Sequence, residues 1–391
     1  MLIIGLVALI ACQPQVALVE VTRIVVVSSA ERPVAVTRLV PQEVTRIVPQ
    51  ELDQELVVDV TKAPLGSAER PVQLLFAPTV DTAVIAARGA TLAQALTAAT
   101  GRVYEVGLLD SEQHVVELMC AAPADTVGFL SAMSYVVAHE RCGVQPANVA
   151  IHGDDLTWQT GMIVVRRDGE MTSLADLAGR RWAVPDTSSV SGFLSFQAML
   201  ADAGVEVGEI VEVPGDSSAV LAVYDGDADF ATASYVPPIL PYDERPWQYG
   251  EDDPEIWRRL SIAPRRSPIG YVLVNGEPEA GGYRVRDARA GIFDTTPEIF
   301  NETSILALSP PIPNETVAFG ASFPFGLSRQ VMAALLDFAN SEACDASICS
   351  ADFYGWAGLA AAEDASYDSL RFLIETLGLS NDEVWALSRD T

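Results

Sequence analysis

A run of hydroxyl side chains lies at one candidate helix start. The run is 187–191, Thr-Ser-Ser-Val-Ser, and it stands with Gly192 between a short apolar strand and an amphipathic helix. Hydroxyls and unpaired N–H groups at a helix N-terminus can bind an anion, because the free donors and the positive end of the helix dipole coincide. For any single residue, ordinary helix capping is the simpler interpretation. The run as a whole predicts an oxyanion site, with capping as the alternative.

The sequence lacks the motifs of several catalytic, metal-binding and nucleotide-binding sites. There is no nucleophile elbow, no His-Glu-x-x-His zinc motif and no P-loop. Acidic residues alternate over 225–229 as in a calcium loop, but Phe230 stands where that loop needs glycine. We expect no enzymatic activity, no cofactor and no metal site, and we interpret the three histidines as surface or packing residues: His114, His139 and His152.

The negative net charge argues against two classes of binding partner. The 391 residues include 24 basic and 53 acidic side chains, for a formal net charge of −29. Nucleic acids and anionic membrane surfaces attract basic proteins, so neither is expected to bind this chain directly. A chain of this length is long enough to form two domains.

The N-terminus has the features of an export signal. Residues 2–11 form an apolar run that is too short to span a bilayer and that ends in Leu-Ile-Ala-Cys at 9–12. The run resembles a bacterial lipoprotein signal, although no basic residue precedes it. We therefore expect residues 1–12 to be a signal peptide with lipidated Cys12, which anchors the protein to the outer face of the cell membrane. A buried structural cysteine is the alternative.

Four cysteines remain, and four cysteines allow three pairings. Cys344 and Cys349 would close a short loop, and Cys120 and Cys142 bracket one strand–helix unit. The absence of a Cys-x-x-Cys spacing disfavours zinc. We predict two disulfides, one within each local pair.

Residues 13–70 have the composition of a tether. Val-Thr-Arg occurs three times, and prolines interrupt any helix. We expect an extended, mostly unfolded linker, with a small β-hairpin as the alternative.

From residue 71 onward, strand and helix patterns alternate, and the last eighty residues are predicted to be chiefly helical. Alternation of this kind indicates an α/β fold with mostly parallel sheets, and such sheets bind ligands beyond the carboxyl ends of their strands.

Four motifs in order resemble one protein family. They are Ser-Leu-Ala-Asp-Leu-Ala-Gly at 173–179 leading to Ser-Val-Ser-Gly at 189–192, the segment 129–138 with Tyr135, Leu-Ala-Val to Gly-Asp-Ala-Asp at 221–229, and Pro-Ile-Pro-Asn-Glu-Thr at 311–316. Together they resemble the substrate-binding proteins of phosphate, phosphite and phosphonate ABC importers over about residues 71–338.

The resemblance implies a periplasmic-binding-protein fold of type 2. Its two lobes would comprise residues 71–160 plus 306–391 and residues 161–305, and they would close over a ligand as a monomer that delivers it to an ABC permease. In this family the ligand's phosphorus-bound oxygens bind a serine-rich turn and a tyrosine. The ligand-binding residues implied or expected here are Ser188, Ser189, Val190, Ser191, Gly192, Tyr135, Thr79, Glu315 and Trp158.

Several positions depart from the family pattern. Val190 lacks the hydroxyl expected in the turn, no acid stands near Val236, and an early aromatic is replaced by Glu-Gln-His at 112–114. The segment 237–288 is longer than the family's usual connection. Two alternatives therefore stay open. The same fold could bind another organic anion or a heterocycle, such as a sulfonate, a carboxylate or a thiamine-precursor-like compound, or it could serve as an extracellular sensory module.

Overall fold

The computed structural model describes residues 63–153, 156–243, 245–276 and 281–387, and the backbone of 18–21 and 38–41. The chain divides into two units, Met1–Lys62 and Ala63–Thr391. In the first unit, β1 (Leu18–Val21) pairs antiparallel with β2 (Arg38–Pro41). The predicted tether therefore contains a strand pair, which was the alternative to an unfolded chain. Cys12 and the rest of the tether up to residue 62 lie outside the described residues.

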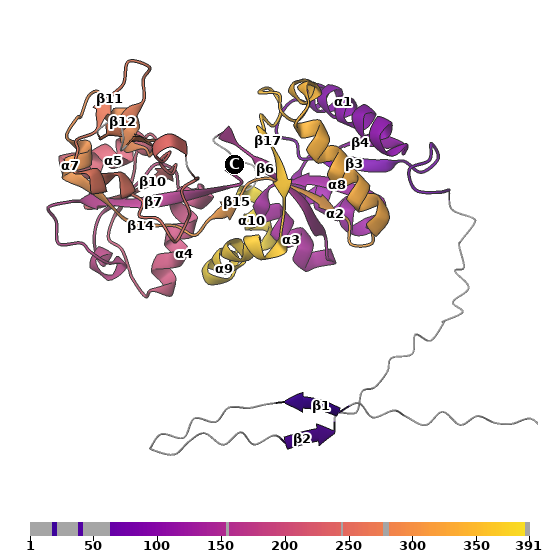
Figure 1. Ribbon diagram of the computed structural model, residues 1–391, viewed down its shortest axis with the longest axis horizontal. Coiled ribbons are helices and arrows are strands. Elements are labelled where there is room, and N and C mark those ends of the chain that lie inside the picture. The colour runs from indigo at the N-terminus through magenta and orange to yellow at the C-terminus, as the bar shows by residue number, and fades with distance from the viewer. Residues whose placement is uncertain are drawn as a thin grey trace, which may run out of the picture. The chain divides into compact units, whose positions relative to one another are not determined.

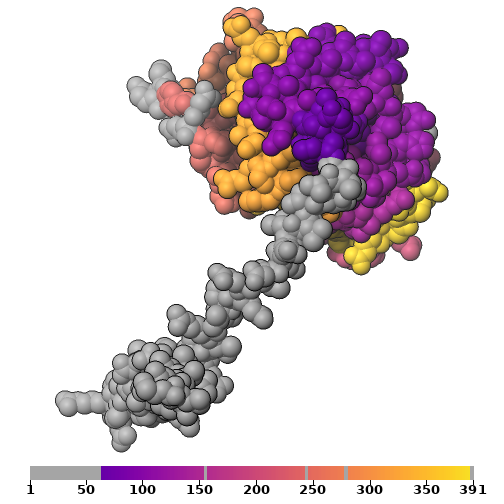
Figure 2. All heavy atoms as spheres, turned by 90° about the vertical axis from the view of Figure 1, so that its right-hand side faces the viewer, coloured from indigo at the N-terminus to yellow at the C-terminus, as the bar shows by residue number. Residues whose placement is uncertain are grey.

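The second unit begins earlier than residue 71. The Arg70 guanidinium bonds both carboxylate oxygens of Asp125, at 3.0 and 2.6 Å, and Leu65 packs against a buried core. Figure 2 shows these first residues, in indigo, lying on the purple atoms of the elements that follow. Residues 63–70 thus belong to the folded unit and not to the linker.

Lobe 1 is built on a six-stranded sheet with strand order β17-β6-β16-β5-β3-β4. Its strands are β3 (Val72–Phe76), β4 (Tyr104–Leu108), β5 (Thr126–Leu130), β6 (Gln145–Ile151), β16 (Thr316–Phe319) and β17 (Gly358–Ala361). Its helices are α1 (Thr82–Thr100), α2 (Glu112–Ala121), α3 (Ala132–Cys142) and α8 (Phe325–Ala339). The central strand β16 comes from the C-terminal part of the chain and lies between β5 and β6.

Lobe 2 is built on a second sheet with strand order β14-β7-β10-β8-β9. Its strands are β7 (Trp158–Arg166), β8 (Trp182–Val184), β9 (Ile210–Glu212), β10 (Phe230–Tyr235) and β14 (Thr303–Leu308). Its helices are α4 (Ser195–Asp202), α5 (Asp216–Asp225), α6 (Arg289–Ile292) and α7 (Ile299–Glu302). The long 237–288 segment adds a small sheet of β11 (Arg265–Arg266), β12 (Val272–Asn275) and β13 (Gly282–Val285).

The α/β class and the two-lobe architecture agree with the prediction, but the sheets are mixed rather than mostly parallel. In lobe 1, only β5-β3-β4 run parallel, while β17-β6-β16-β5 run antiparallel. In lobe 2, β10-β8-β9 are parallel, and β14-β7-β10 are antiparallel.

Two segments carry the chain between the lobes (Figure 1). The start of β7 pairs with β15 (Ile312–Pro313), and the Thr160 hydroxyl donates to the carbonyl oxygen of Ser309 at 2.6 Å. The predicted lobe boundaries, at 160/161 and 305/306, fall within β7 and β14. Hydrogen bonds therefore join the two crossing segments to each other where they connect the lobes.

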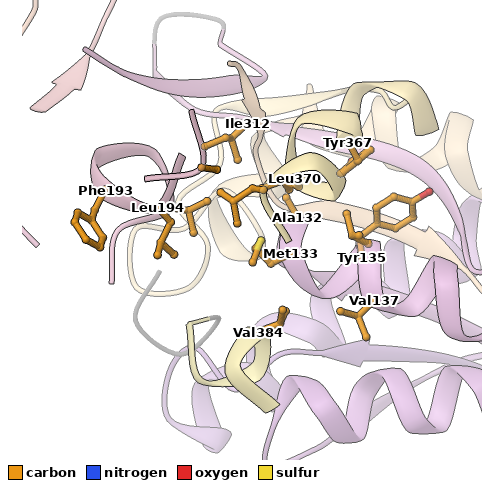
Figure 3. Close-up of a cluster of buried hydrophobic side chains, with 14 of the residues drawn as sticks. Ala132, Met133, Tyr135, Val137, Phe193, Leu194, Ile312, Tyr367, Leu370 and Val384 are labelled. Carbon is orange, nitrogen blue, oxygen red and sulfur yellow. The ribbon is translucent and has the colours of Figure 1, made fainter. Parts of the chain in front are cut away.

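The C-terminal helices connect the two lobes by a third route. Helices α9 (Asp368–Leu377) and α10 (Asn381–Leu387) contribute to one buried cluster that also contains residues of α3 in lobe 1 and of α4 in lobe 2. Figure 3 shows Leu194 of lobe 2 beside Leu370 and near Met133 in this cluster, with Phe193 at its edge. Among the described helices, none combines the length and the apolar character needed to cross a membrane.

Both predicted disulfides are present. Cys120 pairs with Cys142, which joins the C-terminal ends of α2 and α3, and Cys344 pairs with Cys349.

Removing the disulfide that closes the longer loop is expected to cost more stability than removing the one that closes the shorter loop. A disulfide restricts the unfolded chain in proportion to the logarithm of the loop it closes. We expect Cys120→Ala/Cys142→Ala to lower the free energy of unfolding by about 3 kcal/mol and Cys344→Ala/Cys349→Ala by about 2 kcal/mol, measured by urea unfolding. Unchanged unfolding midpoints in both double variants would contradict this.

Candidate ligand-binding site

A cavity of about 450 Å³ lies where the two lobes and the crossing strands meet. Lobe 1 contributes Thr79, Glu112, Ser131 and Tyr354, the crossing segments contribute His152, Trp158 and Glu315, and lobe 2 contributes Val190, Ser191 and Tyr235. The carboxyl ends of β3, β5 and β10 reach this cavity, as expected for an α/β sheet.

The oxyanion turn of lobe 2 is a π-helical turn, Val190–Leu194, that leads into α4. The N–H groups of Val190 and Ser191 have no hydrogen-bond acceptor among the described residues, nor does the Ser191 hydroxyl. Both residues line the cavity. Free donors at the N-terminus of a helix favour a bound anion, so these two residues form the candidate oxyanion site.

The other predicted members of the turn serve local structure. The Ser189 hydroxyl accepts the N–H of Gly192 at 3.0 Å, and the Ser188 hydroxyl donates to Asp186 at 2.8 Å. Neither serine is on the cavity wall, and Ser189 faces a separate outer hollow beside Asp186 and Asp216. Ser189 and Gly192 thus form a helix cap, as in the capping alternative, and Ser188 bonds within its own loop.

Close packing holds the oxyanion turn against β7. A side chain at Gly161 would place its Cβ 2.3 Å from the Ser191 carbonyl oxygen and 2.6 Å from the Phe196 ring. Phe193 packs against Trp182 with ring centroids 4.9 Å apart. The turn thus rests on the crossing strand itself, which couples the position of its N–H groups to the connection between the lobes.

Tyr135 is not on the cavity wall. Its side chain is fully buried, and its hydroxyl donates to Asp364 at 2.5 Å. Burial, and then the nearby Asp364 carboxylate, raise the pKa of this tyrosine. Figure 3 shows its hydroxyl pointing away from Phe193 and Leu194. The family's ligand-binding tyrosine therefore does not match the placement of Tyr135, which here fixes the segment before α9.

Glu315 lies on the cavity wall as predicted, and it is paired with His152. The His152 Nε2 to Glu315 Oε2 distance is 2.7 Å, and both side chains are partly exposed. The hydrogen bond that His152 donates to the Glu315 carboxylate raises the pKa of His152, although burial acts in the opposite direction. The sequence predicts a surface or packing role for His152. The side chain is partly exposed, and it lies on the cavity wall beside a carboxylate that is far away in sequence.

The His152–Glu315 pair predicts a titration that can be measured. We expect His152 to titrate above about 6.5, and Glu315→Gln to lower its pKa, because the main stabilising partner is lost. A raised histidine pKa stabilises the fold at pH values below about 6.5, and this contribution is lost as the pH rises through the folded-state pKa. NMR of the histidine ring protons, assigned with His152→Gln, tests this. The pKa of His114 should not respond to Glu315→Gln, and an unchanged His152 pKa in that variant would contradict the prediction.

Glu112 was not among the predicted site residues, and it reaches the cavity from α2. Its Oε1 accepts the N–H of Ser131 at 2.8 Å, and its Oε2 accepts the Ser131 hydroxyl at 2.7 Å and the Ser134 hydroxyl. The only signal in the sequence is that Glu112 begins the segment where the family has an aromatic residue.

Aromatic rings form much of the remaining wall. Trp158 lines the cavity as predicted, beside Tyr235, and both pack against Trp247 of the long segment, with ring centroids 6.4 and 5.6 Å apart. The long segment therefore supports the wall from behind, because Trp247 is not itself among the lining residues.

Charge on the described cavity wall is mainly negative. Glu112 and Glu315 are carboxylates, His152 is the one titratable base, and the described lining contains no lysine or arginine. An oxyanion bound here would depend on N–H and hydroxyl donors rather than on a positively charged side chain.

Comparisons with known proteins agree with this architecture. A family model described as "ABC transporter, phosphonate, periplasmic substrate-binding protein" matches residues 74–367. Among curated proteins, none matches the chain.

Several solved structures are similar to this chain at low sequence identity. XAC2383 from Xanthomonas citri, bound to ATP, is 14% identical over 82% of this chain and 98% of its own, with a TM-score of 0.43. PhnD1 from Prochlorococcus marinus, in complex with methylphosphonate, is 13% identical over 78% of this chain and 98% of its own, with a TM-score of 0.37.

Proposed function

The chain belongs to the family of periplasmic substrate-binding proteins of phosphonate ABC transporters, and from that membership we propose that it captures a small oxyanion, such as a phosphonate, phosphite or phosphate, for an ABC permease. The observation that carries the proposal is the cavity between the lobes. Two unpaired N–H groups and the free Ser191 hydroxyl line it at the start of a helix.

The proposed mechanism is binding followed by closure. The N–H groups of Val190 and Ser191 and the Ser191 hydroxyl hold the oxyanion from lobe 2. Thr79 and Tyr354 meet the ligand from lobe 1, and Glu315 faces its polar end. Closure about the crossing strands excludes water, which strengthens the hydrogen bonds because the local dielectric constant falls.

An organic anion other than a phosphorus compound is the second candidate. Val190 provides no hydroxyl, so the turn offers one fewer donor to a tetrahedral oxyanion. The two carboxylates of the cavity wall also fit an organic ligand with a polar or cationic end better than an inorganic anion.

A thermal-shift screen of the full chain tests the proposed function. The ligands are phosphite, phosphate, methylphosphonate, 2-aminoethylphosphonate, sulfate and taurine. A ligand at 100 times its Kd adds about 2.7 kcal/mol of stability, which corresponds to a rise of several degrees in Tm. A shift with a phosphorus oxyanion supports the first proposal, and a shift with taurine alone supports the second.

Two serines of the same turn give a matched pair of variants. Ser191→Ala removes a free hydroxyl on the cavity wall and should abolish most of the shift. Ser188→Ala removes a hydroxyl that bonds Asp186 outside the cavity and should leave the shift intact. Equal shifts in both variants would place the ligand elsewhere.

We also propose that residues 1–12 direct export and that Cys12 carries the lipid. Labelling with a radioactive fatty acid should mark the wild-type protein and not the Cys12→Ala variant. A labelled variant would contradict lipidation at Cys12.

A further inference from the structure

Glu112 holds the N-terminus of α3 at the lobe-1 side of the cavity. Its carboxylate accepts one backbone N–H and two hydroxyl groups from Ser131 and Ser134. These donors lie at the start of an 11-residue helix, where a bound anion is favoured. The protein's own carboxylate therefore occupies the position that a ligand anion could otherwise take in lobe 1.

Helices α2 and α3 are joined to each other at both of their ends. Glu112 is the first residue of α2, and its bonds join that end to the start of α3. At the opposite ends, the Cys120–Cys142 disulfide joins the same two helices. The carboxylate is thus held in place as part of the lobe.

A second carboxylate, that of Glu315, lines the same cavity. Glu112, Glu315 and Tyr354 all line the cavity, and the Tyr354 hydroxyl is buried with no hydrogen-bond partner among the described residues. Burial raises the pKa of Tyr354, and the charges of Glu112 and Glu315 raise it further. The Tyr354 hydroxyl consequently stays protonated.

We propose that Glu112 is a specificity-determining residue that makes the cavity select singly charged and zwitterionic oxyanions over dianions. This inference rests on the proposed function. The lobe-2 turn supplies neutral donors for one anionic group. The described lining has two carboxylates, of which Glu315 is paired with His152 and Glu112 bonds neutral donors at the start of α3, and it has no lysine or arginine to offset a second negative charge. Repulsion between like charges grows as water is excluded, so closure increases the discrimination.

The test compares two ligands of similar shape and different charge. Methylphosphonate, at a pH at which it is a dianion, and its methyl monoester, which carries one charge, are titrated calorimetrically into the full chain. We expect the wild type to bind the monoester at least about tenfold more tightly, which is about 1.4 kcal/mol. In Glu112→Gln, the dianion should bind more tightly and the preference should fall to about threefold or less.

Two further variants separate charge from structure. Glu112→Asp keeps the charge and should keep the preference for the monoester. Glu117→Gln removes a carboxylate from the same helix, but one outside the cavity wall, and should leave both affinities unchanged. Gln can still accept the Ser131 N–H, so Glu112→Gln is expected to fold.

The possible outcomes distinguish failure of the charge selection from failure of the proposed function. A wild type that binds both ligands equally, or a Glu112→Gln variant with an unchanged preference, overturns the charge selection and leaves the proposed function standing. The wild-type ratio alone decides the matter if Glu112→Gln does not fold. A wild type that binds neither ligand, nor any compound of the thermal-shift screen, overturns the proposed function and this inference with it.

Discussion

Replacing Gly161 with alanine is expected to weaken ligand binding by about 10- to 100-fold, which corresponds to about 1–3 kcal/mol of overpacking. The new Cβ would lie 2.3 Å from the Ser191 carbonyl oxygen, a backbone atom that cannot rotate away. The oxyanion turn must therefore shift as a whole, and the N–H groups of Val190 and Ser191 move with it. Gly161 also bonds the other crossing segment, since its N–H donates to the Ser309 hydroxyl at 2.9 Å.

Calorimetric titration with a ligand identified by the thermal-shift screen provides the measurement for Gly161→Ala. Gly326→Ala is the matched control, because a Cβ at Gly326 meets no heavy atom within 4 Å and the residue lies in α8, outside the cavity wall. Unchanged affinity in a folded Gly161→Ala protein would show that the turn does not hold the ligand.

The Arg289→Met variant is expected to lose about 3–5 kcal/mol of folding stability. Arg289 is fully buried and bonds Asp287 at 2.9 and 3.0 Å and Glu255 at 2.7 Å. The surrounding arginine charges lower the pKa of Glu255 even though burial opposes this, so the carboxylate stays ionised in the folded protein. Without Arg289, the buried Asp287 carboxylate loses its ion-pair partner, while Glu255 keeps Arg167 and Arg258. An unpaired buried charge is far more costly than a missing contact.

Urea unfolding measures the loss in Arg289→Met, and Arg88→Met is its control. Arg88 also bonds a carboxylate, Asp352, at 2.7 Å, but the Asp352 side chain is 56% exposed. An exposed pair contributes only about 0–1 kcal/mol, so the control should change little. Similar losses in the two variants would mean that the buried ion cluster does not stabilise lobe 2.

Strands with a clear apolar pattern could be predicted from the sequence, and others could not. The buried strands β3, β5 and β8 are short and predominantly apolar, a pattern that the local sequence alone reveals. Strand β6 contains Pro146 and Asn148, which disfavour strands locally, and it pairs because β16 and β17 flank it. The register with β16 shifts next to Pro146, where the missing N–H interrupts the ladder.

The residues of the candidate site could be predicted where they belong to one local sequence motif. Val190 and Ser191 belong to a run of hydroxyl-rich residues at a helix start, and Glu315 belongs to a recognisable motif. Which serine faces the ligand could not be predicted, because Ser189 caps its own turn while Ser191 faces the cavity. His152 and Glu112 reach the site only through tertiary packing, so no local pattern marks them.

The position of β16 has a consequence for the order in which the two lobes can fold. In the lobe-2 sheet, every strand except the two-residue β15 comes from residues 158–308, whereas lobe 1 needs residues 316–319 for its central strand and 358–361 for one edge. A chain that emerges from its N-terminus can thus complete lobe 2 while β5 and β6 still lack the strand that lies between them. Unpaired strand edges invite association with other chains, and long-range pairing is slow. Lobe 1 therefore sets how long the emerging chain remains vulnerable to aggregation.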